Sequence, residues 1–151
     1  ILGKGGIDTI KGGTGSDTLD GGTGDDIIYG ETGNDTVLGG TGSDELYGGS
    51  GTDVLSFSDL IGAGLTIKLS PTSGSAQFGA DLDTFQGFEK YVLTAQGDII
   101  YGSTADDTIV SGGGADTYLG SDGNDTLDGG ADQPILVENC VERHFKWLFD
   151  V

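Results

Sequence analysis

The sequence predicts an all-β fold, a parallel β-roll (β-solenoid) built by the coiling of a short repeat. Aspartate recurs in one nine-residue phase, at Asp8, Asp17, Asp26, Asp35, Asp44, Asp53, Asp98, Asp107, Asp116 and Asp125. Glycines precede the aspartates of the first block at fixed distances, as in GGTGSDTLD from Gly12 to Asp20. A unit this short cannot enclose a core, so its copies must stack on one another.

Each unit follows G-G-x-G-x-D-x-U-x, where U is apolar in every unit of the first block. These apolar residues are Ile10, Leu19, Ile28, Val37, Leu46 and Leu55. The segment x-U-x suits a very short strand whose U side chain points inward. The residues before it are mostly Gly, Thr, Ser and Asp, which favour turns.

The spacing also predicts which aspartates are neighbours. If each unit is half a coil, aspartates 18 residues apart share an edge, which gives the stacked pairs 8/26, 26/44, 17/35, 35/53, 98/116 and 107/125. Stacked carboxylates repel unless a cation lies between them. Glycine lets backbone carbonyls converge, and a cage made only of oxygens suits Ca²⁺ better than Mg²⁺. We therefore expect about six Ca²⁺ ions, one for each stacked pair.

The units resemble the RTX (repeats-in-toxin) nonapeptide of the haemolysin-type calcium-binding family. The repeats cover about 90 of the 151 residues. The resemblance implies a parallel β-roll, Ca²⁺ between stacked turns, export from a Gram-negative bacterium by type I secretion machinery, and folding outside the cell. It also implies that the repeat aspartates are side-chain ligands. Turn carbonyls would complete the sites at Gly13, Gly15, Gly22, Gly24, Gly33, Gly40, Gly42, Gly49, Gly51, Gly112, Gly114 and Gly123.

Some units depart from the pattern. Lys4 and Glu31 stand at the second glycine position. The unit 93–101 lacks all three motif glycines, and the unit 102–110 keeps only the first. We therefore expect the turns at Asp98 and Asp107 to be looser or empty.

The repeats divide the chain into four parts: a first block (1–56), an insert (57–92), a second block (93–132) and a tail (133–151). In the insert, Leu65, Ile67 and Leu69 alternate with polar residues, which predicts a half-buried strand. The insert and its border also supply aromatic and apolar bulk at Phe85, Phe88, Tyr91 and Leu93. In the second block, Tyr118 and Leu127 are expected to point inward.

Asp81 and Asp83 form a D-x-D pair in the insert. One interpretation is an added cation ligand, and the other is a solvated turn before a strand. The stretch 83–94 is similar to a spacer often found between RTX blocks, so the insert is expected to belong to the same fold.

Three interpretations of the tail remain open. Val137, Val141, Phe145 and Leu148 fall at helical spacing, which predicts an amphipathic helix that caps the open end of the solenoid. Alternatively, the tail is part of a C-terminal secretion signal, or a segment not native to the repeat protein.

Composition excludes several classes of function. The net charge is −19 and only six residues are Lys or Arg, so the basic surface that nucleic-acid binding requires is absent. No run of apolar residues is long enough for a transmembrane helix, so membrane insertion by this segment is not expected. The chain opens inside a repeat, and we expect it to be part of a longer extracellular protein.

Catalytic motifs are also missing, because neither H-E-x-x-H nor G-x-S-x-G is present. Cys140 and His144 are too few ligands to close a zinc site. We therefore expect a non-catalytic calcium-binding module, whose parent protein can still be an extracellular polysaccharide-modifying enzyme, protease or lipase. The alternative is a calcium-stiffened adhesive or glycan-binding module, in which Tyr29 and Tyr47 stack on an outer face.

Overall fold

A computed structural model describes residues 1–119, 122–130, 136–138 and 146–147. Every regular element in these residues is a β-strand. The strands are β1 (Leu2–Gly5), β2 (Thr9–Thr14), β3 (Thr18–Thr23), β4 (Ile27–Thr32), β5 (Thr36–Thr41), β6 (Glu45–Ser50), β7 (Val54–Ser56), β8 (Thr66–Ser70), β9 (Ser73–Phe78), β10 (Asp81–Gln86), β11 (Lys90–Val92), β12 (Ile99–Tyr101), β13 (Thr108–Val110), β14 (Thr117–Leu119), β15 (Thr126–Asp128), β16 (Leu136–Glu138) and β17 (Lys146–Trp147).

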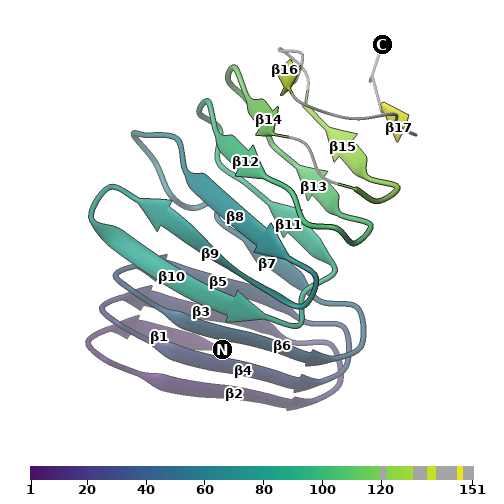
Figure 1. Cartoon of the computed structure of the whole chain (residues 1–151). Coiled ribbons are helices and arrows are strands. Elements are labelled where there is room, and N and C mark those ends of the chain that lie inside the picture. The colour runs from purple at the N-terminus through teal and green to yellow at the C-terminus, as the bar shows by residue number, and fades with distance from the viewer. Residues whose placement is uncertain (120–121, 131–135, 139–145, 148–151) are drawn as a thin grey trace.

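The described strands form two sheets that face each other (Figure 1). One sheet has eight strands in the order β1-β3-β5-β7-β11-β13-β15-β17, and the other has nine in the order β16-β14-β12-β8-β9-β10-β6-β4-β2. All neighbours are parallel except the pairs that β9 makes with β8 and β10. Both sheets run through both repeat blocks, so the parallel β-roll is confirmed as one continuous solenoid.

The inward apolar row of the first block is confirmed. Its six U residues are at most 5% exposed to solvent, and Tyr118 and Leu127 continue the row in the second block. Burial of one such side chain stabilises the fold by about 1.5–3 kcal/mol. Ordering of the backbone costs about 1–2 kcal/mol per residue. One buried side chain in nine residues therefore cannot hold the first block together alone.

Strand length differs between the two blocks. The predicted three-residue strand x-U-x is found in the second block, from β12 to β15. In the first block, strands β2 to β6 have six residues and continue through the first two positions of the next unit. Equivalent residues of successive coils pair there, as Gly22 does with Gly40, because the repeat keeps them in register.

The second and fourth repeat positions have left-handed backbone throughout the first block and wherever glycine is kept there in the described part of the second block. All twelve glycines expected to contribute carbonyls have φ between 86° (Gly112) and 142° (Gly51). Lys4 (φ 82°) and Glu31 (φ 76°) adopt the same conformation although they carry side chains. The stacked pairing of the coils thus imposes a conformation that these two residues intrinsically disfavour.

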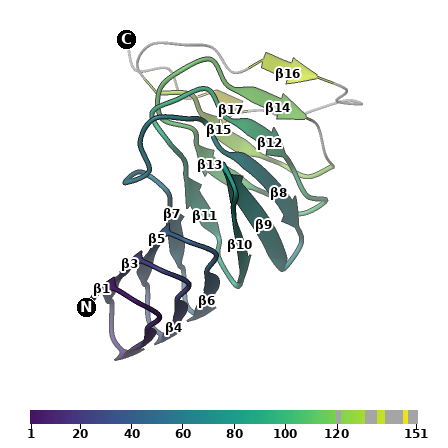
Figure 2. The ribbon, with the colours of Figure 1, turned by 90° about the vertical axis from the view of Figure 1, so that its left-hand side faces the viewer.

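The insert adds a three-stranded meander to one sheet only. A single coil there supplies β8, β9 and β10, while the opposite sheet receives one strand per coil. At a strand spacing of about 4.8 Å, the two additional strands lengthen one sheet by roughly 10 Å. Figure 2 shows the two repeat blocks inclined to each other across this insert.

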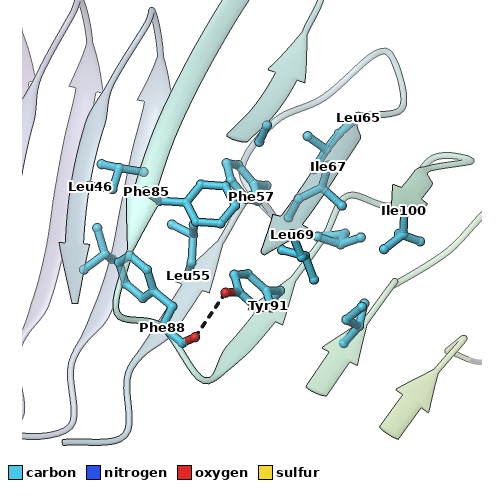
Figure 3. Close-up of a cluster of buried hydrophobic side chains, with 14 of the residues drawn as sticks. Leu46, Leu55, Phe57, Leu65, Ile67, Leu69, Phe85, Phe88, Tyr91 and Ile100 are labelled. Atoms are coloured by element: carbon cyan, nitrogen blue, oxygen red, sulfur yellow. Dashed lines mark hydrogen bonds between the residues drawn. The ribbon is translucent and has the colours of Figure 1, made fainter. Parts of the chain in front are cut away.

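An aromatic cluster fills the space inside the insert (Figure 3). The Phe85 ring centroid lies 6.5 Å from that of Phe57, 6.4 Å from that of Phe88 and 5.6 Å from that of Tyr91. The Tyr91 hydroxyl donates a 3.1 Å hydrogen bond to the Phe88 carbonyl. The predicted alternation in β8 is confirmed, because Ile67 and Leu69 are buried between less buried neighbours.

Strand β11 belongs to the roll although it lies within the insert. It pairs with β7 and β13, and Tyr91 aligns with Leu55 and Ile109 in the inward row. In the tail, β16 pairs with β14 and β17 pairs with β15. Val137 of the expected helix therefore lies in a strand, and Val141, Phe145 and Leu148 lie outside the described residues, as do Cys140 and His144. In the part of the chain that the structure describes, no helix could cross a membrane.

Candidate metal sites

The repeat aspartates form two hydrogen-bonded columns, one on each edge of the roll. In six of them, the backbone amide donates to Oδ1 of the aspartate 18 residues later. The donor–acceptor distance is 2.8 Å for the pairs 8/26, 17/35, 26/44 and 35/53, and 3.0 Å for the pairs 98/116 and 107/125. All six predicted stacked pairs are thus confirmed as neighbours.

Two residues of the insert accept the last amide hydrogen bond of each column in the first block. The Asp44 amide donates to Oδ1 of Asp83 at 2.9 Å, and the Asp53 amide donates to Oε2 of Glu89 at 2.7 Å. Glu89 was not anticipated, although it lies 36 residues after Asp53 and so keeps the repeat phase. Asp83 lies 39 residues after Asp44, outside that phase, and only the D-x-D pair marked it.

The second carboxylate oxygens of the first block have no partner. Oδ2 is buried and accepts no hydrogen bond in Asp8, Asp17, Asp26, Asp35, Asp44 and Asp53. Four of these residues, from Asp26 to Asp53, are at most 1% exposed. A buried carboxylate oxygen without a partner is strongly destabilising. These oxygens therefore fit a bound cation.

Backbone oxygens face the same gaps between coils. A Cβ added at Gly12 would lie 2.7 Å from the carbonyl oxygen of Gly30 in the next coil and 3.1 Å from Oδ2 of Asp17. Other carbonyl oxygens point toward the following coil, where that of Gly15 faces Gly33 and that of Gly33 faces Gly51. Glycine is required at these places because any side chain would collide with an oxygen.

The available ligands are therefore mainly oxygens of the backbone, with one carboxylate from each turn. Within the described residues, no three His, Cys, Asp or Glu side chains converge on one point. A cation held here must draw on carbonyl groups as well. Hard cations with flexible coordination, above all Ca²⁺, prefer such a set of oxygens.

The electrostatics of the columns also favour a cation. Burial raises the pKa of Asp44 to about 6, and repulsion from Asp26, Asp25 and Asp81 adds to the rise. Burial raises the pKa of Asp83 to about 7, with added repulsion from Asp44. The fold without metal thus disfavours the charged carboxylates, and a divalent cation would reverse this preference.

The aspartates of the second block are equally buried, but their carboxylates have different partners. Asp98, Asp107, Asp116 and Asp125 are at most 7% exposed. Side-chain hydroxyl groups of neighbouring residues donate to each of these carboxylates. The two blocks therefore share a repeat pattern but differ in the chemistry of their turns.

Comparison with known proteins agrees with this geometry. The family model described as the RTX calcium-binding nonapeptide repeat matches four segments, residues 2–37, 29–59, 94–127 and 111–133. These matches cover more than half of the chain, and they fall on the two blocks and spare most of the insert. No curated protein sequence matches the chain significantly. The chain therefore belongs to the RTX calcium-binding nonapeptide repeat family, and its repeat domain is a structural calcium-binding module.

Proposed function

We propose that this chain is a module of a larger secreted protein, and that Ca²⁺ binding drives the folding of its first repeat block. The observation that carries the proposal is the set of buried, unpartnered Oδ2 atoms in that block. The repeat aspartates would bind Ca²⁺ through these atoms, and turn carbonyls of the two adjoining coils would complete each site. Bound Ca²⁺ would neutralise the columns and hold successive coils together.

The energies support a tight coupling between ion binding and folding. Extracellular Ca²⁺ modules bind the ion at ~10⁻⁴–10⁻³ M. At ten times the dissociation constant, each site adds about 1.4 kcal/mol, so the four stacked pairs of the first block would add roughly 6 kcal/mol. That amount is comparable to the whole stability of a small domain. It would compensate for the sparse apolar row.

Such coupling suits a protein that is exported before it folds. At the low Ca²⁺ concentration of a cytosol, a chain with a net charge of −19 would remain extended through its own repulsion. An extended chain can pass through the channel of a type I secretion system. Outside a Gram-negative cell, millimolar Ca²⁺ would then fold the first block.

A titration with Ca²⁺, followed by far-ultraviolet circular dichroism, tests the proposal. We expect the β-sheet signal to rise with Ca²⁺, to fall again in excess EGTA, and to respond little to Mg²⁺. The variant Asp35→Asn, which removes one buried charge of a column, should need more Ca²⁺ for the same change. A signal that is identical in EGTA and in Ca²⁺ would contradict the proposal.

A second candidate function is glycan binding, and one feature of the outer surface favours it. The rings of Tyr29 and Tyr47 stack with centroids 4.8 Å apart and an angle of 10° between their planes. A cavity of about 250 Å³ adjoins Tyr47, and Ser73, Thr84 and Gln86 are among its other lining residues. An aromatic face beside hydroxyl and amide groups is a suitable surface for a sugar ring.

A glycan array in millimolar Ca²⁺ tests this second function. Binding that is lost in Tyr47→Ala and kept in Tyr101→Ala would support it, since Tyr101 is exposed on the same sheet but distant in strand order. Absence of any binding would exclude it.

A further inference from the structure

In the second block, side-chain hydroxyl groups donate hydrogen bonds to the repeat carboxylates, in turns that lack one or more motif glycines. Oγ1 of Thr94 donates to Oδ1 of Asp98 at 2.8 Å, and the Thr94 amide donates to Oδ2 at 3.1 Å. The next turn repeats this arrangement, with Oγ of Ser103 donating to Oδ1 of Asp107 at 3.0 Å and its amide donating to Oδ2 at 2.8 Å. Both oxygens of each carboxylate are therefore hydrogen-bonded within its own turn.

The following two turns use other donors for the same purpose. Oγ of Ser111 donates to Oδ2 of Asp116 at 2.5 Å, and the Tyr118 hydroxyl donates to Oδ2 of Asp125 at 3.0 Å. Both donors are fully buried. Among the described residues, the buried carboxylate oxygens that lack a partner all belong to the first block.

The sequence explains why the two blocks differ. Thr94 and Ser103 stand at the second repeat position, where the first block has Gly, Lys4 or Glu31. Ser111 stands at the first position, which is always Gly in the first block. At the first position of a first-block unit, a Cβ would collide with a carboxylate, as one added at Gly21 would with Oδ2 of Asp26. A hydroxyl at either position of the second block instead reaches the carboxylate and donates to it.

The hydroxyls also reduce what a turn can offer to a cation. A carboxylate oxygen that accepts an O–H hydrogen bond directs one of its two lone pairs to the donor, so it has less capacity left to bind an ion. The turns at Asp98 and Asp107 also lack glycine at the fourth position, where Gln96 and Ala105 stand, so fewer carbonyls can converge there. The hydroxyl donors and the missing glycines thus both lower the capacity of these turns to bind Ca²⁺.

We propose that Thr94, Ser103, Ser111 and Tyr118 replace the cation in the second block, so that Ca²⁺ binding is confined to the first block and its junction with the insert. The two ions that the stacked pairs 98/116 and 107/125 predict are then not bound. This inference rests on the proposed function for the first block, and it assigns these four hydroxyls as the groups that decide which turns bind Ca²⁺.

Equilibrium dialysis of the whole chain over a range of Ca²⁺ concentrations, up to saturation, measures the number of bound ions and their affinity. Asp26→Asn in the first block and Asp107→Asn in the second are matched variants, since each removes the charge of a buried repeat aspartate. We expect fewer ions per chain in Asp26→Asn, and an unchanged number and affinity in Asp107→Asn. Loss of an ion in Asp107→Asn would overturn the inference and leave the proposed function standing. If the unaltered chain bound no Ca²⁺, both would fail.

A second pair of variants does not depend on ion counting. Ser103→Ala removes a hydroxyl donor, and Thr23→Ala removes an exposed hydroxyl of the first block. We expect Ser103→Ala to lower the midpoint of urea unfolding at saturating Ca²⁺, without changing the number of bound ions, and Thr23→Ala to leave both unchanged. An Asp107 turn that binds Ca²⁺ would instead gain affinity when the competing hydroxyl is removed, and that result would refute the inference.

Discussion

The backbone amide of Asp44 donates a 2.9 Å hydrogen bond to Oδ1 of Asp83, as the amide of Asp26 does to Oδ1 of Asp44 at 2.8 Å. Asp83 comes from the meander of the insert, not from a repeat unit, yet it occupies the place of the next repeat aspartate. The amide of Gly42 also donates to Oδ2 of Asp81, at 3.3 Å. The insert thus supplies the carboxylate acceptors that a further repeat turn would have supplied to the first block.

The bond between Asp44 and Asp83 gives the first prediction. Asp83→Ala leaves the buried Asp44 amide without its acceptor, which should cost about 1–3 kcal/mol in the free energy of unfolding. Asp83→Asn is the matched control, because it keeps Oδ1 as an acceptor and removes a charge that burial disfavours. Without Ca²⁺, Asp83→Asn should be at least as stable as the unaltered chain. Urea unfolding of the three proteins checks this, and equal losses in both variants would show that the bond is unimportant.

The second prediction concerns position within a column. Asp26 accepts a hydrogen bond from Asp8 and donates one to Asp44, whereas Asp8 has a repeat neighbour on one side only. If Ca²⁺ lies between stacked turns, Asp26 contacts two ions and Asp8 contacts one. Asp26→Ala should therefore lower the apparent Ca²⁺ affinity and the cooperativity more than Asp8→Ala. Calorimetric titration measures both, and equal effects would argue against ions between turns that are 18 residues apart.

The third prediction concerns the backbone of Glu31. Its φ of 76° is left-handed, a conformation that costs roughly 1–2 kcal/mol for a residue with a side chain. Its ion pair with Lys11, at 3.8 Å, is exposed and contributes little. Glu31→Gly should therefore stabilise the protein by about 1 kcal/mol in thermal unfolding. The control is Glu45→Gly at a normal strand position, which should destabilise it. Stabilisation by both changes would mean that φ is not the cause.

The fourth prediction is a pH dependence that Ca²⁺ inverts. The pKa values of Asp44 and Asp83, about 6 and about 7 in the fold, exceed the ordinary value of 3.8. Between pH 4 and pH 7 the fold therefore binds more protons than the unfolded chain, so its stability without metal falls as pH rises. With Ca²⁺ present, protons compete with the ion, so Ca²⁺ affinity should rise over the same range.

Circular dichroism at a series of pH values, in EGTA and in Ca²⁺, separates the two trends. Asp44→Asn is the control, because it removes one of the buried carboxyls whose pKa is raised and should flatten both curves. A β-sheet signal in EGTA that grew with increasing pH would contradict the assignment of these carboxyls.

The nine-residue period alone determined most of the roll. It fixed the inward row from Ile10 to Leu55, the stacking of aspartates 18 residues apart, and the stacking of Tyr29 on Tyr47. Those features follow from the sequence because a coil of constant length brings each residue onto its own equivalent. No knowledge of distant contacts is required. The same reasoning reached Tyr118 and Leu127, because their units keep the phase and most of the motif glycines.

The tertiary structure decided what the period does not govern. Asp83 reaches the Asp44 column because an antiparallel meander brings it there, 39 residues along the chain and out of phase. The role of Thr94 depends on the orientation of the Asp98 carboxylate, which the local turn sets and the spacing of aspartates does not. A repeat specifies which residues are neighbours, but the fold around each pair decides whether a hydroxyl is close enough to hydrogen-bond to its carboxylate.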